Sequence, residues 1–346
     1  MSELSTSAHE HAIAALDRVI YLLDRSLAAP QKIRAFAAAK QVISQLEDSE
    51  LVQRCSEATL ETLVGIGSST GSVISAAVLG SPNTYIERLE STTEVPLGEG
   101  ADLRALLRGD CHLHSHWSDG SSSIESMAIS AMALGHSYIV MTDHSPRLTV
   151  AHGLTPERFA KQAAEIASVN ERLAPFRVLR GCEVDILEDG SLDLPEELLA
   201  GLDLVVASVH SKLAMPEHEM TARMVSAIAS PHVDVLGHCT GRKVTGTGRK
   251  PSSFDADLVF AACKQFGVAV EINCRPERQD PPDDLVELAK SWGTDFVINT
   301  DAHAPGQLEW LNYGCDKATN IDISSDRIIN TKSAEELVEW THFTAA

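Results

Sequence analysis

The sequence predicts an α/β protein whose larger part is a barrel of parallel strands, preceded by a small all-α domain. From residue 109 onward, short apolar runs rich in β-branched residues alternate with helical stretches, as in parallel sheets covered by helices. Residues 1–92 instead carry apolar side chains at the three- and four-residue spacing of amphipathic helices. A length of 346 residues accommodates two such domains.

The N-terminal part is predicted to be helical throughout. Apolar positions fall on one face over residues 8–28, and a second helix is expected to start at Pro30. More helix is expected over residues 49–64, followed by a tight turn at Gly65 and Gly67. We therefore assign residues 1–92 to the helical domain, 93–108 to a linker rich in Ser, Thr, Pro and Gly, and 109–346 to the α/β domain.

Seven strands are expected in the α/β domain, and seven strand–helix units favour a closed, barrel-like arrangement. Nearly every strand ends in a residue type that binds metals: His112, His114, Asp119, His144, Glu183, His210, His238, Asp301 and His303. Active sites of parallel barrels assemble at these carboxyl ends. Any one of these histidines is more often a structural residue, but unpaired carboxylates beside apolar strands are costly to bury without cations.

Nine ligands exceed the four that one zinc ion takes, so the sequence predicts two or three divalent ions, either zinc, manganese or iron. His116 is not expected to be a ligand, because Asp119 offers a harder oxygen donor nearby. Metal-activated hydroxide is a nucleophile at neutral pH. We expect Glu183 to bridge ions and to act in catalysis with Asp301 and His303. Cations expected to hold a substrate phosphate are Lys212, Arg242, Arg275 and Arg278.

Composition narrows the function classes. The formal net charge of −21 disfavours nucleic acid as a partner unless basic residues cluster locally. Seven cysteines, an odd number without C-x-x-C spacing, favour a reducing cytoplasm over a disulfide framework. No leader is expected at the N-terminus, and no apolar run approaches the roughly 20 residues of a membrane span, so no membrane association is expected.

The motifs Asp110-Cys-His-Leu-His114, Ser118-Asp-Gly120, Thr142-Asp-His144, Gly181-Cys-Glu183, Ser208-Val-His210, Leu236-Gly-His238 and Asp301-Ala-His303 resemble those of the polymerase and histidinol phosphatase (PHP) family. The resemblance covers residues 109–325. It implies a distorted seven-stranded (β/α) barrel, the PHP fold, that hydrolyses phosphate esters at a trinuclear site. By position, it implies one ion on His112, His114, Glu183 and Asp301, a second on Asp119, His144 and His303, and a third on Glu183, His210 and His238.

The α/β part is most similar to the PHP domain that ends bacterial X-family DNA polymerases. The N-terminal part resembles their helix-hairpin-helix domain, which implies DNA-backbone contacts through the amides of Gly65 and Gly67. No polymerase palm lies between the two parts, and Val73 replaces a Schiff-base lysine, so neither polymerase nor lyase activity is expected. Residues 1–100 hold seven basic and thirteen acidic residues, a net charge of −6, which makes a packing or dimerisation role the alternative to DNA binding.

The function expected from these motifs is hydrolysis of a small phosphomonoester or nucleotide. One alternative is a 3′–5′ exonuclease acting on DNA ends with the same metal centre. A second is an amidohydrolase-type deaminase or lactonase, which shares the H-x-H and final aspartate but not the Glu183 bridge. A third is a non-catalytic binding module with a degenerate site, against which nine retained ligand types argue.

Overall fold

The computed structural model describes residues 7–344, and the chain divides into two compact units, Met1–Glu94 and Val95–Ala346. The first unit contains helices α1 (Ala8–Arg25), α2 (Pro30–Ile43), α3 (Asp48–Ser56), α4 (Ser68–Val78) and α5 (Thr84–Thr92), with a 3-10 turn, η1 (Leu60–Thr62). Ser7 begins α1 with a capping box, because its hydroxyl accepts from the Glu10 amide and the Glu10 carboxylate accepts from the Ser7 amide.

The apolar faces predicted for these helices form the core of the first unit, which includes Leu16, Leu23, Phe36, Ile43, Leu51, Val73 and Ile74. The helix expected over residues 49–64 stops at Ser56, because Ala58 adopts a left-handed conformation with φ of 54°. That the unit is a helix-hairpin-helix domain stays a prediction.

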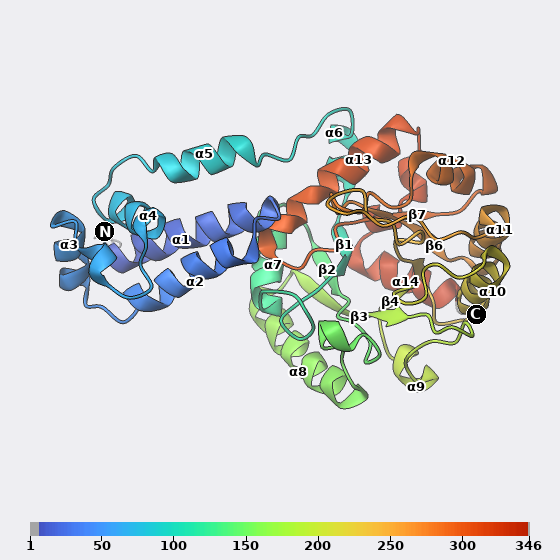
Figure 1. Ribbon diagram of the computed structural model, residues 1–346. Helices are drawn as coiled ribbons and strands as arrows, with labels where there is room; N and C mark the ends of the chain where they lie inside the picture. The colour runs from blue at the N-terminus through green and yellow to red at the C-terminus, as the bar shows by residue number, and fades with distance from the viewer. Residues whose placement is uncertain (1–6, 345–346) are drawn as a thin grey trace. The chain divides into compact units, whose positions relative to one another are not determined.

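The second unit confirms the predicted seven-stranded α/β fold (Figure 1). All strand pairs are parallel, and the strands lie in sequence order. Their bounds are β1 (Gly109–Leu113), β2 (Tyr138–Met141), β3 (Arg177–Asp185), β4 (Leu204–Ser208), β5 (Val235–Leu236), β6 (Ala269–Asn273) and β7 (Phe296–Asn299).

Strands β1 and β7 meet, so the sheet is nearly closed. The His114 amide donates to the Ala302 carbonyl at 2.8 Å, just beyond the strand ends. At the opposite end, Nδ2 of Asn330 donates to the carbonyls of Gly109 in β1 and Ile298 in β7. One amide side chain thus bridges the two strands where a continuous ladder is missing, which satisfies buried backbone groups.

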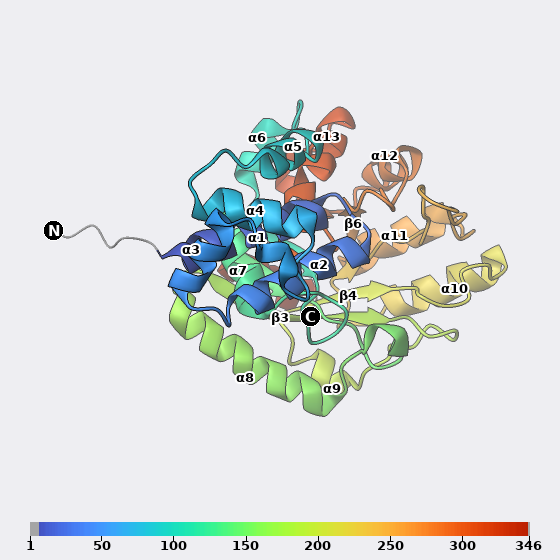
Figure 2. The same ribbon diagram turned by 60° about the vertical axis from the view of Figure 1, so that its left-hand side comes forward.

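Helices surround the barrel (Figures 1 and 2). They are α6 (Ala101–Leu106), α7 (Ile124–Ala133), α8 (Pro156–Leu173), α9 (Glu196–Leu199), α10 (Glu217–Ile228), α11 (Ala256–Phe266), α12 (Asp283–Trp292), α13 (Leu311–Asn320) and α14 (Ala334–Thr344). Helices α10, α11 and α12 stand side by side in both views. Helix α6 lies within the predicted linker. Among the described residues, no helix combines the length and hydropathy needed to cross a bilayer.

Candidate metal centre

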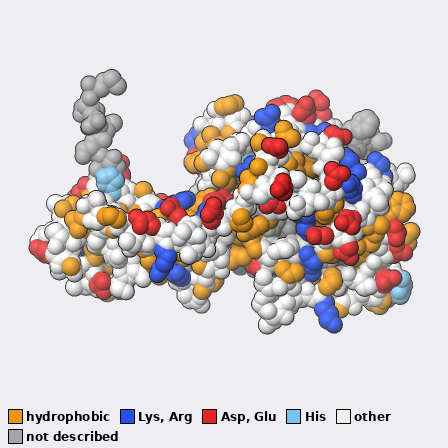
Figure 3. All heavy atoms as spheres, turned by 90° about the horizontal axis from the view of Figure 1, so that it is seen from above, with side chains coloured by type: hydrophobic (Ala, Val, Ile, Leu, Met, Phe, Trp, Pro, Cys, Tyr) orange, Lys and Arg blue, Asp and Glu red, His pale blue; other side chains and the backbone are white. Residues whose placement is uncertain are grey.

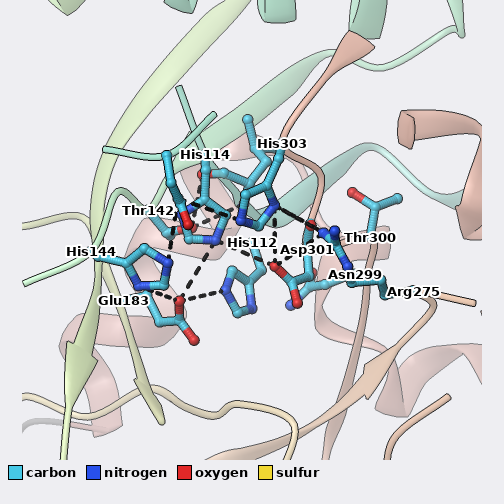
Figure 4. Close-up of polar contacts among 12 residues, drawn as sticks. His112, His114, Thr142, His144, Glu183, Arg275, Asn299, Thr300, Asp301 and His303 are labelled. Carbon is cyan, nitrogen blue, oxygen red and sulfur yellow. Dashed lines mark hydrogen bonds and ion pairs between the residues drawn. The ribbon is translucent and has the colours of Figure 1, made fainter. Parts of the chain in front are cut away.

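The nine predicted ligand residues gather at the carboxyl ends of the barrel strands. Cys111 and Leu113 of β1 pack in two different apolar clusters, whereas His112 in β1 and His114 just after it both reach the ligand cluster. The pairing of β1 with β2 shifts register between Asp110 and Leu113, so this part of the strand departs from regular two-residue alternation. In Figure 4, side chains of the centre point toward one another, among them those of His112, His114, His144, Glu183, Asp301 and His303.

Glu183, from β3, lies at the middle of the cluster and is 1% exposed. One of its oxygens, Oε1, lies 2.8 Å from Nε2 of His238 and 3.2 Å from Nε2 of His210. The other, Oε2, lies 2.9 Å from Nδ1 of His144 and 3.3 Å from Nε2 of His112. Nε2 of His114 lies 3.6 Å from the same Oε2. A carboxylate with histidines on both oxygens has the arrangement of a bridging ligand.

A second group of contacts involves the carboxylates that follow β1 and β7. Oδ1 of Asp119 lies 3.4 Å from Nε2 of His303 and 3.5 Å from Nε2 of His144. Oδ1 of Asp301 lies 3.4 Å from Nε2 of His114. Asp301 has a positive φ of 54°, a left-handed conformation that aspartate adopts more readily than most residues.

Unsatisfied polar atoms test whether these residues fit metal ions. Eight buried atoms of the cluster meet no hydrogen-bond geometry with any described residue, although several lie within ion-pair distance of carboxylates: Nε2 of His112, both ring nitrogens of His114 and His210, Nδ1 of His144 and His238, and Oε2 of Glu183. Buried polar groups are rarely left without partners. Lone pairs that converge in this way fit divalent cations with nitrogen and oxygen ligands.

Four sets of ligand atoms lie close enough together to hold an ion. They are His114–Asp119–His144–His303, His112–His114–Asp301, His112–Glu183–His238 and His144–Glu183–His210. These sets overlap the grouping implied by the family resemblance, and Glu183 belongs to two sets in both. They differ because Glu183 is absent from the set of His112, His114 and Asp301, and because His238 joins His112 instead of His210.

The electrostatics of the cluster depend on burial and on the mixture of charges. Burial would lower the pKa of His144, but Glu183 and Asp119 raise it to about 10. Burial, together with the charges of His303 and His144, lowers the pKa of His114 to about 3. Burial opposes ionisation of Glu183, yet His112, His210 and His144 hold its pKa well below the usual range. When no metal is bound, some of the candidate ligands, among them His144, therefore carry protons.

Comparisons with known proteins agree with this geometry. The model of the PHP domain matches residues 110–275. A probable phosphatase of Aliivibrio fischeri is 30% identical over 244 residues, which cover 66% of this chain and 91% of that protein. The chain belongs to the PHP family. It is a metal-dependent phosphoesterase, a hydrolase whose cofactors are divalent metal ions.

Other known proteins match over similar spans. A probable phosphatase of Thermoanaerobacter is 29% identical over 233 residues, which cover 64% of this chain and 89% of that protein. The DNA polymerase/3′-5′ exonuclease PolX of Bacillus subtilis is 38% identical over 232 residues, which cover 67% of this chain but 40% of PolX. A crystal structure of histidinol phosphate phosphatase from Lactococcus lactis, complexed with zinc, L-histidinol and phosphate, has a TM-score of 0.45 and 18% identity, and covers 62% of this chain and 92% of that chain.

Carboxylates that contact the candidate ligands from outside the four sets were not identified from the sequence. Oε1 of Glu271 lies 2.6 Å from Nδ1 of His112, and Oδ1 of Asp185 lies 3.3 Å from Nδ1 of His210. Such partners fix the orientation of a ligating imidazole and raise its basicity. The sequence contains one indication that Glu271 has a special role, because it is a carboxylate inside an otherwise apolar strand.

A polar network also fixes the loop that carries Asp119. Asp143 is fully buried and accepts from the amides and hydroxyls of Ser115 and Ser118. A Cβ at Gly120 would come within 2.6 Å of the His114 carbonyl oxygen, so only glycine fits this close approach. The Ser-Asp-Gly motif therefore places Asp119 beside His144 and His303.

The four cations predicted to hold phosphate lie in different settings. Nε of Arg278 is 3.1 Å from Oδ2 of Asp301, and Nη1 of Arg275 is 3.0 Å from Nδ1 of His303. Figure 4 shows Arg275 beside Asp301 and His303. The Arg242 guanidinium donates to the carbonyls of Arg278 and Gln279, so it fixes the backbone of these two residues. Lys212 is exposed.

The remaining sequence predictions fall outside the cluster. His116 is in none of the four ligand sets, and its Nδ1 lies 3.3 Å from the Ser122 carbonyl oxygen. In the first unit, Gly65 has a φ of 97°, as a tight turn requires. The Gly67 amide donates to the Thr70 hydroxyl at 2.9 Å, so this group already has a partner.

Proposed function

We propose that the chain hydrolyses phosphomonoesters of small molecules or nucleotides at the cluster centred on Glu183. The observation that carries this proposal is the convergence of nine ligand-type side chains, two of which contact arginines. Arg278 contacts Asp301, and Arg275 contacts both Asp301 and His303. Cations at this edge would hold phosphate oxygens, since guanidinium groups match their geometry.

The residues of the candidate site would have distinct roles. Glu183, Asp301 and His303 would hold the ions, with the other six ligand residues completing the set. Bound divalent ions supply Lewis acidity, which lowers the pKa of a coordinated water and offsets charge on phosphoryl oxygens. Arg278 keeps Asp301 ionised and oriented, and Arg275 binds both the Asp301 carbonyl and the His303 ring.

A second candidate is 3′–5′ exonuclease activity, favoured by the 38% identity to PolX. The net charge of −21 and the occupied Gly67 amide favour a small substrate instead. We also propose a cytoplasmic location, because all seven cysteines are free thiols in buried positions.

The test compares two substrates on the same Mn²⁺-loaded protein: a chromogenic phosphomonoester and a 3′-labelled single-stranded DNA. Turnover of the monoester with intact DNA is the expected result. Stepwise shortening of the DNA with little monoester turnover would favour the exonuclease. Hydrolysis of neither substrate would refute both assignments.

A further inference from the structure

A short hairpin follows the ligand His238 in the second unit. Lys243 and Arg249 pair in an antiparallel bridge, in which each amide donates to the carbonyl of the other residue at 2.9 Å. The turn between them contains Gly246 and Gly248, with φ of 65° and 67°. These left-handed positions allow a tight reversal, so the two basic residues stand side by side.

The hairpin is fastened to the loop after β6, which borders the metal centre. The Val244 amide donates to the Glu277 carbonyl at 2.7 Å, and Nε of Arg242 donates to the Arg278 carbonyl at 3.0 Å. Arg278 in turn contacts Asp301 at 3.1 Å. A continuous chain of contacts therefore links the hairpin to a carboxylate of the ligand set.

The cations in this region outnumber the carboxylates that pair with them. Arg275 pairs with Glu277 and Arg278 with Asp301, but no carboxylate between residues 7 and 344 lies within ion-pair distance of Lys243 or Arg249. Partial burial lowers the pKa of Lys243, and the charges of Arg278, Arg249 and Arg275 lower it further against the opposing charge of Glu277. Like charges held this close favour an anion that binds between them.

A locally basic segment is unusual in a chain with a net charge of −21. On the face seen in Figure 3, acidic and basic side chains are interspersed. The turn segment Lys243–Arg249 contains two basic residues and no acidic residue. No acidic side chain of the hairpin therefore offsets the attraction of these two cations for an anion.

We propose that Lys243 and Arg249 form a second anion subsite, which binds a phosphate of the substrate other than the one that reacts. This inference rests on the proposed phosphoesterase function and narrows the substrate class to molecules with at least two phosphate groups. The second phosphate can belong to a small bisphosphate or to the neighbouring phosphodiester of a short strand. Arg275 and Arg278 would remain with the reacting phosphate.

The test uses the full, Mn²⁺-loaded chain and three substrates: a nucleoside monophosphate, the corresponding nucleoside 3′,5′-bisphosphate and a 5′-phosphorylated trinucleotide. The variants are the single substitution Lys243→Gln and the double substitution Lys243→Gln with Arg249→Gln. In the wild type, the Lys243 side chain makes no hydrogen bond or ion pair with any of residues 7–344. The double variant Lys161→Gln with Lys264→Gln is the matched control, because it removes the same charge from two exposed positions on α8 and α11.

We expect the hairpin double variant to raise KM for the bisphosphate about tenfold, with Lys243→Gln intermediate, while kcat and the KM for the monophosphate change less than twofold. The control pair should behave as wild type. An increase confined to the trinucleotide would support the subsite and identify a phosphodiester as its ligand. An equal increase for the monophosphate would overturn the proposal, because the cations would then serve the reacting phosphate.

Equilibrium binding of the same bisphosphate, followed by calorimetry, separates this proposal from the proposed function. If no ester is turned over, the phosphoesterase assignment fails, but a weaker affinity of the hairpin variant would still support the anion subsite. Equal affinities of wild type and the hairpin double variant for both the bisphosphate and the trinucleotide would refute the subsite, whatever the activity.

Discussion

Nδ1 of His112 lies 2.6 Å from Oε1 of Glu271, and both side chains are fully buried. The other oxygen of Glu271 accepts from the His238 amide at 2.7 Å. Burial would raise the pKa of Glu271, but His112 and other donors lower it, so the carboxylate is ionised. One carboxylate therefore orients two of the proposed ligands from behind.

We expect Glu271→Gln to weaken metal binding about 10- to 100-fold, because the amide cannot hold the His112 ring as the carboxylate does. Chelator competition with the folded protein measures this affinity directly. Glu287→Gln, on the exposed side of α12, is the control and should bind as wild type. Unchanged affinity in Glu271→Gln would show that Glu271 has no positioning role.

Glu183→Ala should lower kcat for a phosphate ester by at least about 100-fold without unfolding the chain. The side chain lies within ion-pair distance of five histidines, so its loss mainly removes ligand atoms from the cluster. Circular dichroism and kcat on one preparation measure both effects. Near-wild-type turnover would contradict the assignment of the site.

Metal binding should release protons. Glu183 and Asp119 raise the pKa of His144 to about 10 against the effect of burial, so its ring is protonated at neutral pH when no metal is bound. A ligating imidazole must be neutral, so at pH 7 we expect at least one proton to leave per chain. The release should vanish as the pH rises through the pKa near 10.

Calorimetry of Mn²⁺ binding in two buffers of different ionisation enthalpy counts these protons. His144→Gln should reduce the count by about one at pH 7. Binding without proton release in the wild type would mean that the histidines are already neutral in the metal-free protein.

A buried carboxyl outside the proposed ligand set predicts a pH dependence of stability. Burial raises the pKa of Asp234, at the start of β5, to about 7, although the Val205 amide donates to it. The native state therefore binds a proton that the unfolded state, with a pKa near 3.8, releases first. This stabilisation is complete below pH 4 and is lost as the pH rises through 7.

Asp234→Asn keeps the acceptor for Val205 and removes the ionisation. Relative to wild type, it should gain up to about 4 kcal/mol in free energy of unfolding between pH 4 and pH 8. Denaturant titrations of both proteins at several pH values give this difference, and effects of the metal site cancel in it. Parallel pH profiles would refute the account of Asp234.

Parallel strand order and two-residue alternation made the candidate site predictable. His112 and His114 had to share a face, and the other seven ligand types had to meet at the same rim of the barrel. The partners of these residues were not predictable, because only the strand register shows that Glu271 faces His112. Helix α6 was missed because its start depends on a distant contact: Asp316 accepts from the amides of Gly98 and Gly100.

The most direct test of the account is a metal titration of the chelated protein, with bound metal and phosphate release measured on the same samples. We predict no hydrolysis without metal, activity that rises as Mn²⁺ or Zn²⁺ is bound, and saturation at two or three ions per chain. Full activity in the metal-free protein, or a folded protein that binds no ion, would contradict it.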